Sequence, residues 1–397
     1  MKLGLVGKPS VGKSSLFKAM TLAEVDIADY PFTTIDPNVG VGYVKVKEVA
    51  LEFGKEPNPR HGYYLKGYRF VPVEIIDVAG LVPGAHEGKG LGNKFLDDLR
   101  QADALIVVVD ASGKTNEKGE AVNSANEDIS KDFEFLLHEL DMWIKGILER
   151  NWQKIARLEM QKVKSSEEVI ADVLSGLKIK EEDVKKALLD TGLYEKQLVQ
   201  WSDDDLMRFS KHIRKLKPIV VAANKADTPG AKERIEAMKK KYPDYTIIPT
   251  SAQAELALKL AAKQGLIEYV PGDSDFKVLD ESKLTEKQKN ALEYIKKNVL
   301  DVYGSTGVQQ LIDTAVFDLL GYVAVFPGGS KLEDKDGNVL PDCFLMPPGS
   351  TALDFAYRLH KDIGDKFVKA IDVRTKKVLG KDYVLKHLDI IEIMHQA

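Results

Sequence analysis

The segment from Gly7 to Ser14, Gly-Lys-Pro-Ser-Val-Gly-Lys-Ser, constrains the fold of this chain more than any other stretch. It fits the pattern G-x-x-x-x-G-K-S and stands between an apolar run of strand length, residues 2–6, and a helical pattern over residues 13–22. A strand, a glycine-rich loop and a helix in this order present backbone N–H groups that bind phosphate. We expect the loop and the first helical turn to bind a nucleotide through Gly7, Lys8, Pro9, Ser10, Val11, Gly12, Lys13, Ser14 and Ser15.

Short apolar runs of strand length recur through the first 250 residues, and helical stretches separate them. Several runs are continuous rather than alternating, which is typical of strands buried on both faces of a largely parallel sheet. The pattern predicts a doubly wound α/β fold. Strands are expected over residues 2–6, 39–46, 70–76, 105–109, 219–222 and 246–248, and helices over 13–22, 91–100 and 231–240.

The α/β pattern is interrupted over residues 121–216, where apolar residues recur at helical spacing and convincing strands are lacking. This stretch predicts an inserted all-helical domain. The nucleotide-binding domain is then expected over residues 1–120 and 217–320, with two helices at its end, near residues 285–299 and 307–320. Residues 321–397 return to a strand, helix, strand pattern that is typical of a small α+β domain.

Composition excludes several classes of protein. A hydrophobic fraction of 44% and a charged fraction of 30% exclude a disordered or collagen-like chain. The single cysteine, Cys343, excludes a disulfide framework and predicts a reducing, cytoplasmic environment. A net charge of −4 gives no overall attraction to nucleic acid, and no apolar run approaches the roughly 18 residues that cross a bilayer. We therefore expect neither DNA nor a membrane as a partner.

The tetrapeptide Asp-Val-Ala-Gly at residues 77–80 follows the predicted strand 70–76. In a phosphate-binding α/β fold this is the place for an acid that holds Mg²⁺ and for a glycine whose N–H meets the γ-phosphate. We assign these roles to Asp77 and Gly80. Lys13 would reach the β- and γ-phosphates, and the Ser14 hydroxyl would bind Mg²⁺ directly.

The tetrapeptide Asn-Lys-Ala-Asp at residues 224–227 follows another predicted strand and lies at the carboxyl edge of the sheet, where such folds bind ligands. The Asp227 carboxylate can accept hydrogen bonds from N1 and N2 of guanine, a donor pair that adenine lacks. Lys225 would cover the base plane, and Asn224 would tie the loops together. Backbone groups of Ser251 and Ala252 would meet the guanine O6. The motifs together predict a protein that binds and hydrolyses GTP.

The same motifs resemble the Obg group of translation-factor-class GTPases, especially its YchF-related branch. The resemblance rests on residues 30–40, Tyr-Pro-Phe-Thr-Thr-Ile-Asp-Pro-Asn-Val-Gly, and on residues 77–93. Residues 347–360 resemble part of a TGS domain, a ubiquitin-like β-grasp module. The resemblance implies a cytoplasmic, Mg²⁺-dependent GTPase that acts as a nucleotide-controlled switch on ribosomes or other RNA-containing complexes.

Two departures from the family pattern bear on the nucleotide and on its ions. YchF proteins commonly carry N-x-x-E and prefer ATP, whereas the intact N-K-x-D at residues 224–227 favours GTP. An ATPase resembling YchF is one alternative, and a nucleotide-dependent binding module with negligible hydrolysis is another. Potassium-activated relatives often have asparagine at the place of Ser10, so a K⁺ requirement stays open.

The resemblance also supplies candidates for catalysis. Thr34, in the first switch segment, is expected to contact Mg²⁺ and the γ-phosphate. Leu81 stands where glutamine-using GTPases orient the attacking water, and an aliphatic side chain cannot do so. Slow intrinsic hydrolysis follows. His86 is a candidate general base, with an ordinary solvated loop histidine as the alternative.

Overall fold

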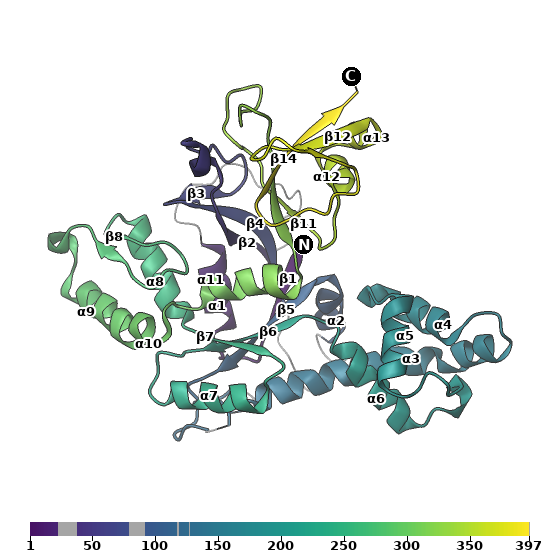
Figure 1. Ribbon diagram of the computed structural model, residues 1–397. Coiled ribbons are helices and arrows are strands. Elements are labelled where there is room, and N and C mark those ends of the chain that lie inside the picture. Colours follow the sequence, from purple (N-terminus) through teal and green to yellow (C-terminus); the bar gives the residue numbers. More distant parts are fainter. Residues whose placement is uncertain (23–37, 79–91, 117–118, 127, 397) are drawn as a thin grey trace.

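A seven-stranded sheet forms the centre of the computed structural model (Figure 1). The structure describes residues 1–397 apart from 23–37, 79–91, 117–118, 127 and 397, and apart from the side chains of 92–96. The strand order is β2-β4-β1-β5-β6-β7, with β3 paired to β4. These strands are β1 (Lys2–Val6), β2 (Val39–Lys47), β3 (Tyr63–Leu65), β4 (Tyr68–Asp77), β5 (Ala104–Asp110), β6 (Ile219–Asn224) and β7 (Thr246–Thr250).

Five strands of this sheet, β1 and β4 to β7, run parallel, whereas β2 and β3 pair with β4 in the antiparallel sense. All residues of β5 and β6 are buried, which explains their continuous apolar sequences. The parallel arrangement gathers the carboxyl ends of these five strands at one edge. The residues at these ends are Val6, Asp77, Asp110, Asn224 and Thr250. The expected doubly wound α/β fold is confirmed.

Helices cover both faces of the sheet. One face packs against α1 (Lys13–Thr21), α8 (Ala252–Lys263) and α11 (Val308–Asp313), with the π-helical segment Thr314–Leu319 continuing α11. The other face packs against α2 (Gly92–Gln101), α3 (Lys131–Met160) and α7 (Ala231–Lys241). The sheet is therefore the middle of three layers.

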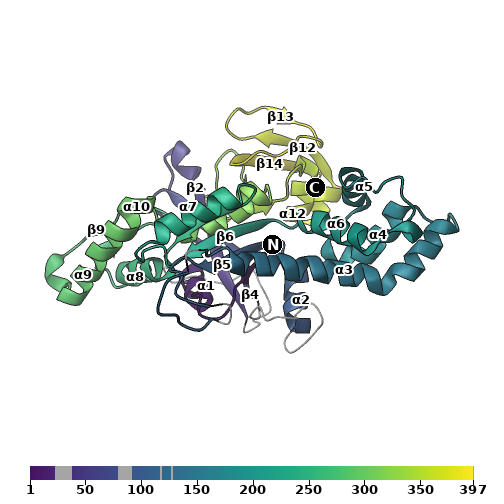
Figure 2. The same cartoon turned by 90° about the horizontal axis from the view of Figure 1, so that it is seen from below.

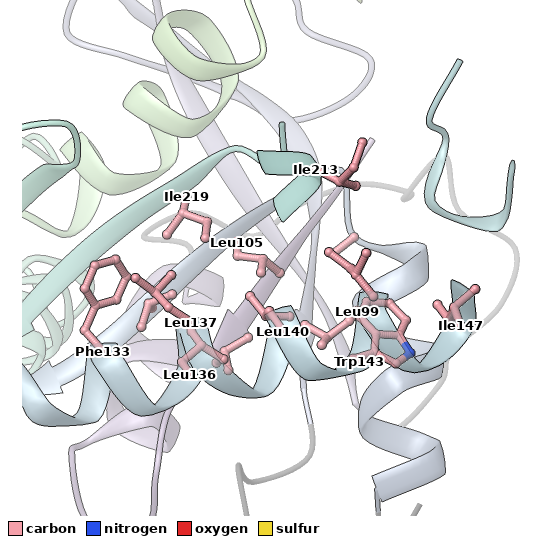
Figure 3. Close-up of a cluster of buried hydrophobic side chains, with 14 of the residues drawn as sticks. Leu99, Leu105, Phe133, Leu136, Leu137, Leu140, Trp143, Ile147, Ile213 and Ile219 are labelled. Atoms are coloured by element: carbon pink, nitrogen blue, oxygen red, sulfur yellow. The ribbon is translucent and has the colours of Figure 1, made fainter. Parts of the chain in front are cut away.

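The long helix α3 leaves the sheet and joins α4 (Ser166–Leu174), α5 (Glu181–Asp190) and α6 (Asp203–Arg214) in a helical bundle. Figure 3 shows Phe133, Leu137 and Leu140 of α3 beside Leu105 and Ile219 of the sheet. Further along the same helix, a second set of apolar side chains meets α2 and α6. This set comprises Trp143 and Ile147 of α3, Leu99 of α2 and Ile213 of α6. One continuous core thus joins the sheet and the bundle.

After α8 the chain forms a small unit with its own apolar cluster. It contains β8 (Ile267–Glu268), β9 (Lys277–Val278), α9 (Glu286–Ile295), a π-helical segment (Lys296–Leu300) and α10 (Asp301–Tyr303). In both Figure 1 and Figure 2, α9 and the bundle of α4 to α6 lie at opposite ends of the molecule.

The C-terminal residues form a second sheet with the order β11-β10-β14-β12-β13, in which β10 and β14 are parallel. Phe355 of helix α12 packs on this sheet against Val325, Met346 and Ile391. The elements are β10 (Val323–Pro327), β11 (Phe344–Met346), α12 (Ala352–Leu359), α13 (Lys361–Asp365), β12 (Phe367–Asp372), β13 (Val378–Leu379) and β14 (Asp389–His395). No helix in the described part of the chain is long and apolar enough to cross a membrane.

Candidate nucleotide-binding site

The loop from Gly7 to Ser14 leads from the end of β1 into α1 at the carboxyl edge of the sheet. Gly12 has a φ of 90°, and a Cβ at this position would lie 2.3 Å from Asn224 Nδ2. A larger residue would therefore clash with that amide and also strain the backbone. Gly12 is the N-cap of α1 and brings no side-chain cap, so the first N–H groups of the helix face a place suited to an anion.

Lys13 and Asp77 meet beside this loop. Asp77 ends β4, which pairs with β1, and its carboxylate forms an ion pair with the Lys13 ammonium. Lys13 Nζ also donates a hydrogen bond to the Val78 carbonyl at 2.8 Å. The predicted phosphate-binding cation and the predicted metal-binding acid therefore lie at one point of the sheet edge.

The oxygen groups beside the loop suit a hard cation such as Mg²⁺. This ion usually takes one or two carboxylates, and nucleotide phosphates and water complete its shell. The exposed side chain of Ser14 lies in the first turn of α1, directly after Lys13, whose ammonium touches Asp77. Among the described residues no group of three or more His, Cys, Asp and Glu side chains could hold a metal ion.

Asn224, the buried last residue of β6, is hydrogen-bonded to two other segments at this edge of the sheet. Its Nδ2 donates to the Val11 carbonyl at 2.9 Å, and its Oδ1 accepts from the Ala252 N–H at 3.1 Å. Because Val11 lies in the phosphate loop and Ala252 follows β7, one amide fixes the phosphate loop to the neighbouring edge of the sheet.

Lys225 and Asp227 lie in the loop after β6. Lys225 has a φ of 63°, and its Nζ donates to the Ser10 carbonyl at 2.8 Å. The Asp227 carboxylate accepts a hydrogen bond from Ser251 Oγ at 2.9 Å. A cavity of about 100 Å³ lies among these groups, lined by Gly12, Ser15, Asn224, Lys225, Asp227, Thr228, Ser251, Ala252 and Gln253.

Asp110, which is part of none of the sequence motifs, also belongs to this site. It ends β5, is buried, and pairs with Lys225 Nζ at 3.0 Å. Burial acts to raise the pKa of Asp110, but hydrogen bonds from Ser112, Lys225 and Thr115 outweigh it, so the pKa lies below its usual value. The ionised carboxylate holds the lysine toward the phosphate loop. Its place after a buried strand, at the same edge as Asp77, is the signal that could have identified it.

The side chain of Lys8 extends away from the N-terminus of α1, toward the first turn of α3. Lys8 is buried, and its Nζ donates to the Asn116 carbonyl at 2.7 Å and pairs with Asp132 at 2.8 Å. Asp132 lies in the first turn of α3. The expected phosphate contact of Lys8 is therefore limited to its backbone, while its side chain connects the phosphate loop to the long helix.

Three predicted catalytic residues, Thr34, Gly80 and His86, lie outside the residues that the structure describes, as does Leu81. Pro9 and Ser10 lie in the phosphate loop, and Ser10 has a φ of 67°.

Three parts of the chain match known protein families. Residues 2–139 match the family described as 50S ribosome-binding GTPase. Residues 222–329 match the G4 motif-containing domain of the Obg-like GTPase YGR210-like family. Residues 323–395 match the TGS domain.

Individual proteins match over the whole chain. An uncharacterised GTP-binding protein of Methanocaldococcus jannaschii is 50% identical over 398 residues, covering 100% of this chain and 99% of the relative. The ribosome-binding ATPase YchF of Bacillus subtilis is 29% identical, covering 98% and 97%. The crystal structure of a GTP-binding protein from Pyrococcus horikoshii covers 100% of both chains, with 41% identity and a TM-score of 0.78.

Proposed function

The chain belongs to the Obg-like, YchF-type GTPases and is a GTP-binding protein of this class, and we propose that it hydrolyses GTP to GDP and phosphate with Mg²⁺. The observation that carries the choice of GTP is Asp227. Its carboxylate is held by Ser251 beside a cavity that also borders Gly12 and Ser15 of the phosphate-binding segment. Asp227 would thus recognise the base next to the place where the phosphates would bind.

Guanine selectivity follows from the chemistry of this carboxylate. Two acceptor oxygens match the N1–H and N2–H₂ donors of guanine, and adenine cannot supply both. A site built for such donors rejects the wrong base strongly because its buried polar groups would stay unpaired. Lys225, whose ammonium is anchored on Ser10 and Asp110, runs from this loop to the phosphate loop.

The phosphates would bind at the N-terminus of α1, with Lys13 turning from Asp77 toward the β- and γ-oxygens. Ser14, Asp77 and, in the switch segment, Thr34 would hold Mg²⁺. When bound, Mg²⁺ neutralises the charge that develops on the transferred phosphoryl group. Gly80 would place its N–H on the γ-phosphate. This chain's own contribution is to position the nucleotide and to release Lys13 from its carboxylate partner.

We propose slow intrinsic turnover. Leu81 cannot orient water, so acceleration would come from a partner or from a group such as His86. A ribosomal or other RNA-containing partner is supported by the relative named ribosome-binding ATPase and by the matching family described as ribosome-binding. Such a partner would place the protein in the cytoplasm, where the nucleotide state would control its contacts.

One alternative has support of its own. The YchF relative is named an ATPase, so ATP is the rival substrate. The second alternative is a GTP-dependent binding module without appreciable hydrolysis.

One set of measurements separates the three readings. Binding competition between GTP and ATP identifies the nucleotide, and single-turnover hydrolysis with and without ribosomes identifies the reaction, with Lys13→Ala as the inactive control. We expect GTP to bind more tightly than ATP and ribosomes to accelerate the hydrolysis of GTP. Equal competition by ATP would favour the ATPase, and hydrolysis no faster than in Lys13→Ala under either condition would favour the binding module.

A further inference from the structure

Two tyrosines from the unit after α8 reach the loop that follows β6. Tyr303 Oη donates a hydrogen bond to the Ala226 carbonyl at 2.9 Å, and Tyr294 Oη donates to the Asp227 carbonyl at 3.0 Å. Tyr294 lies in α9 and Tyr303 ends α10. The two phenols therefore hold consecutive carbonyls of the segment whose side chain reads the base.

The helix between the tyrosines has a special geometry. Tyr303 follows Tyr294 by nine residues, which is about two and a half turns of a regular α-helix and would place the side chains on opposite sides. The π-helical segment Lys296–Leu300 lies between them. A π turn contains more residues than an α turn, so it reduces the angle between the two side chains.

The loop that they contact has an unusual backbone. Lys225 adopts a left-handed φ of 63° although it is not glycine. Such a conformation persists only where the surrounding contacts fix it. The Ala226 N–H donates to the Thr250 carbonyl at 3.0 Å, and the tyrosine hydroxyls supply two further contacts directly after the strained residue.

Helix α8, which packs against the unit that carries the two tyrosines, holds the Asp227 side chain. Ser251 is the N-cap of α8, and its hydroxyl donates to the Asp227 carboxylate. Helix α8 shares an apolar cluster with α9 and the π-helical segment, in which Leu258 packs with Leu292 and Ile295. Figure 1 shows α8, α9 and α10 together at one end of the molecule. The side chain and the backbone of Asp227 are thus fixed from one packed unit.

Both phenols keep their protons at neutral pH. Burial raises the pKa of Tyr303 to about 12, and the nearby carboxylates of Glu233 and Asp227 act in the same direction. The pKa of Tyr294 is raised as well, by burial and by Asp227. Each hydroxyl is therefore a hydrogen-bond donor, as the carbonyl contacts require.

We propose that Tyr303 and Tyr294 are positioning residues for base recognition. By fixing the Ala226 and Asp227 carbonyls, they orient the Asp227 carboxylate so that it meets the N1 and N2 donors of guanine together. This inference rests on the proposed function, because it takes guanine as the base that Asp227 reads.

The test compares GTP with inosine triphosphate, which keeps N1–H and O6 but lacks the N2 amino group. Dissociation constants are measured for the wild type, Tyr294→Phe, Tyr303→Phe and the double variant. Tyr357→Phe is the matched control, because Tyr357 is 46% exposed against 47% for Tyr294 and its hydroxyl bonds Asp365 in the TGS domain.

We expect Tyr303→Phe to weaken GTP binding about fivefold, the effect of one lost neutral hydrogen bond. Binding of inosine triphosphate should weaken less, so that the preference for GTP over inosine triphosphate falls. The double variant should lower this preference further. Tyr294→Phe should act in the same direction but less, because its hydroxyl is more exposed. Tyr357→Phe should leave the preference unchanged.

Equal weakening of both nucleotides, or no change in either, would overturn the positioning role and leave the proposed function standing. A wild type that fails to prefer GTP over both inosine triphosphate and ATP would instead contradict the proposed function itself.

Discussion

Gly12 is the residue of the phosphate loop with the least room for a side chain. Its φ is 90°, and a Cβ would lie 2.3 Å from Asn224 Nδ2. In Gly12→Ala the methyl group should displace the Asn224 amide from the Val11 carbonyl. We expect a loss of about 1–3 kcal/mol in the free energy of unfolding, by denaturant titration, and weaker GTP binding. Unchanged stability together with unchanged affinity would show that the loop adopts another conformation.

Two lysines of the same loop differ in the direction of their side chains, and this gives a matched pair of variants. Lys13→Ala should remove about 2–4 kcal/mol of GTP binding free energy, because it removes a charged phosphate contact. Lys8→Ala should leave the affinity nearly unchanged, since the Lys8 ammonium bonds Asn116 and Asp132. Calorimetric titration checks both values. Equal losses in the two variants would refute the assignment of their roles.

At the scale of single residues, the sequence was informative wherever a short motif follows a predicted strand. Asn224 and Asp227 could be placed at the sheet edge for this reason. The direction of the Lys8 side chain could not be predicted, because its partners come from a segment more than a hundred residues away. Asp110 was missed because it belongs to no familiar motif.

Among the elements, the long buried strands could be predicted and the short ones could not. The strands β3, β8, β9, β11 and β13 contain only two or three residues, too few to show a periodicity. They form because a neighbouring strand offers hydrogen-bond partners. The helix expected near residues 285–299 begins close to that position but continues as a π-helical segment, which the apolar spacing did not distinguish.

The junction between α2 and β6 offers a test by pH. Lys217 Nζ donates to the carbonyls of Leu99 and Ala102 at the end of α2, and burial lowers the pKa of Lys217 to about 8 from an ordinary value of 10.5. Below pH 8 both the folded and unfolded states carry the proton, and burying the charge costs stability. Between pH 8 and 10.5 the folded state loses the proton first, so stability rises with pH.

The variant Lys217→Met should lack this pH dependence. We therefore expect the unfolding free energy of the wild type, minus that of the variant, to increase by about 2 kcal/mol between pH 7.5 and pH 10. Denaturant titrations at several pH values measure the difference, and other titrating groups cancel in it. A difference that is constant or falls with pH would contradict the burial of a charged Lys217.

For the whole molecule, the buried Arg69 joins the nucleotide-binding sheet to the TGS domain, and Glu48 of its own domain balances its charge. Arg69 of β4 pairs with Glu48 at 2.7 Å, both side chains are almost fully buried, and Arg69 also donates to the Leu340 carbonyl between β10 and β11. The Arg69 guanidinium lies 5.2 Å from the ring centre of Phe326 in β10.

Arg69→Met would leave the Glu48 carboxylate buried without its partner. We expect the unfolding free energy to fall by about 3–5 kcal/mol and the double variant Glu48→Gln/Arg69→Met to recover most of this loss. Thermal and denaturant unfolding of the full chain provide the values. A single variant as stable as the wild type would show that the buried Arg69 contributes nothing to holding the two domains together.

The order of the nucleotide-binding domain, the helical insert and the C-terminal domain along the chain could be predicted from where strand and helix patterns alternate. How these parts pack against one another could not be predicted. The apolar positions of α3 indicate a buried face but not its partner, and the structure shows that Phe133 faces the sheet whereas Ile147 faces the bundle. The site beside α1 gathers residues from the segments after β1, β6 and β7, so it depends on how the sheet brings their ends together.

The central claim is that Asp227 selects guanine, and the exchange Asp227→Asn tests it most directly. The new amide replaces one acceptor by a donor, which opposes a guanine donor but suits the carbonyl that xanthine carries at that position. Dissociation constants for GTP, ATP and xanthosine triphosphate are measured on both proteins at equal Mg²⁺ and salt. The wild type should prefer GTP, and Asp227→Asn should prefer xanthosine triphosphate. A wild type that binds ATP as tightly as GTP, or an Asp227→Asn protein that keeps its full preference for GTP, would contradict the claim.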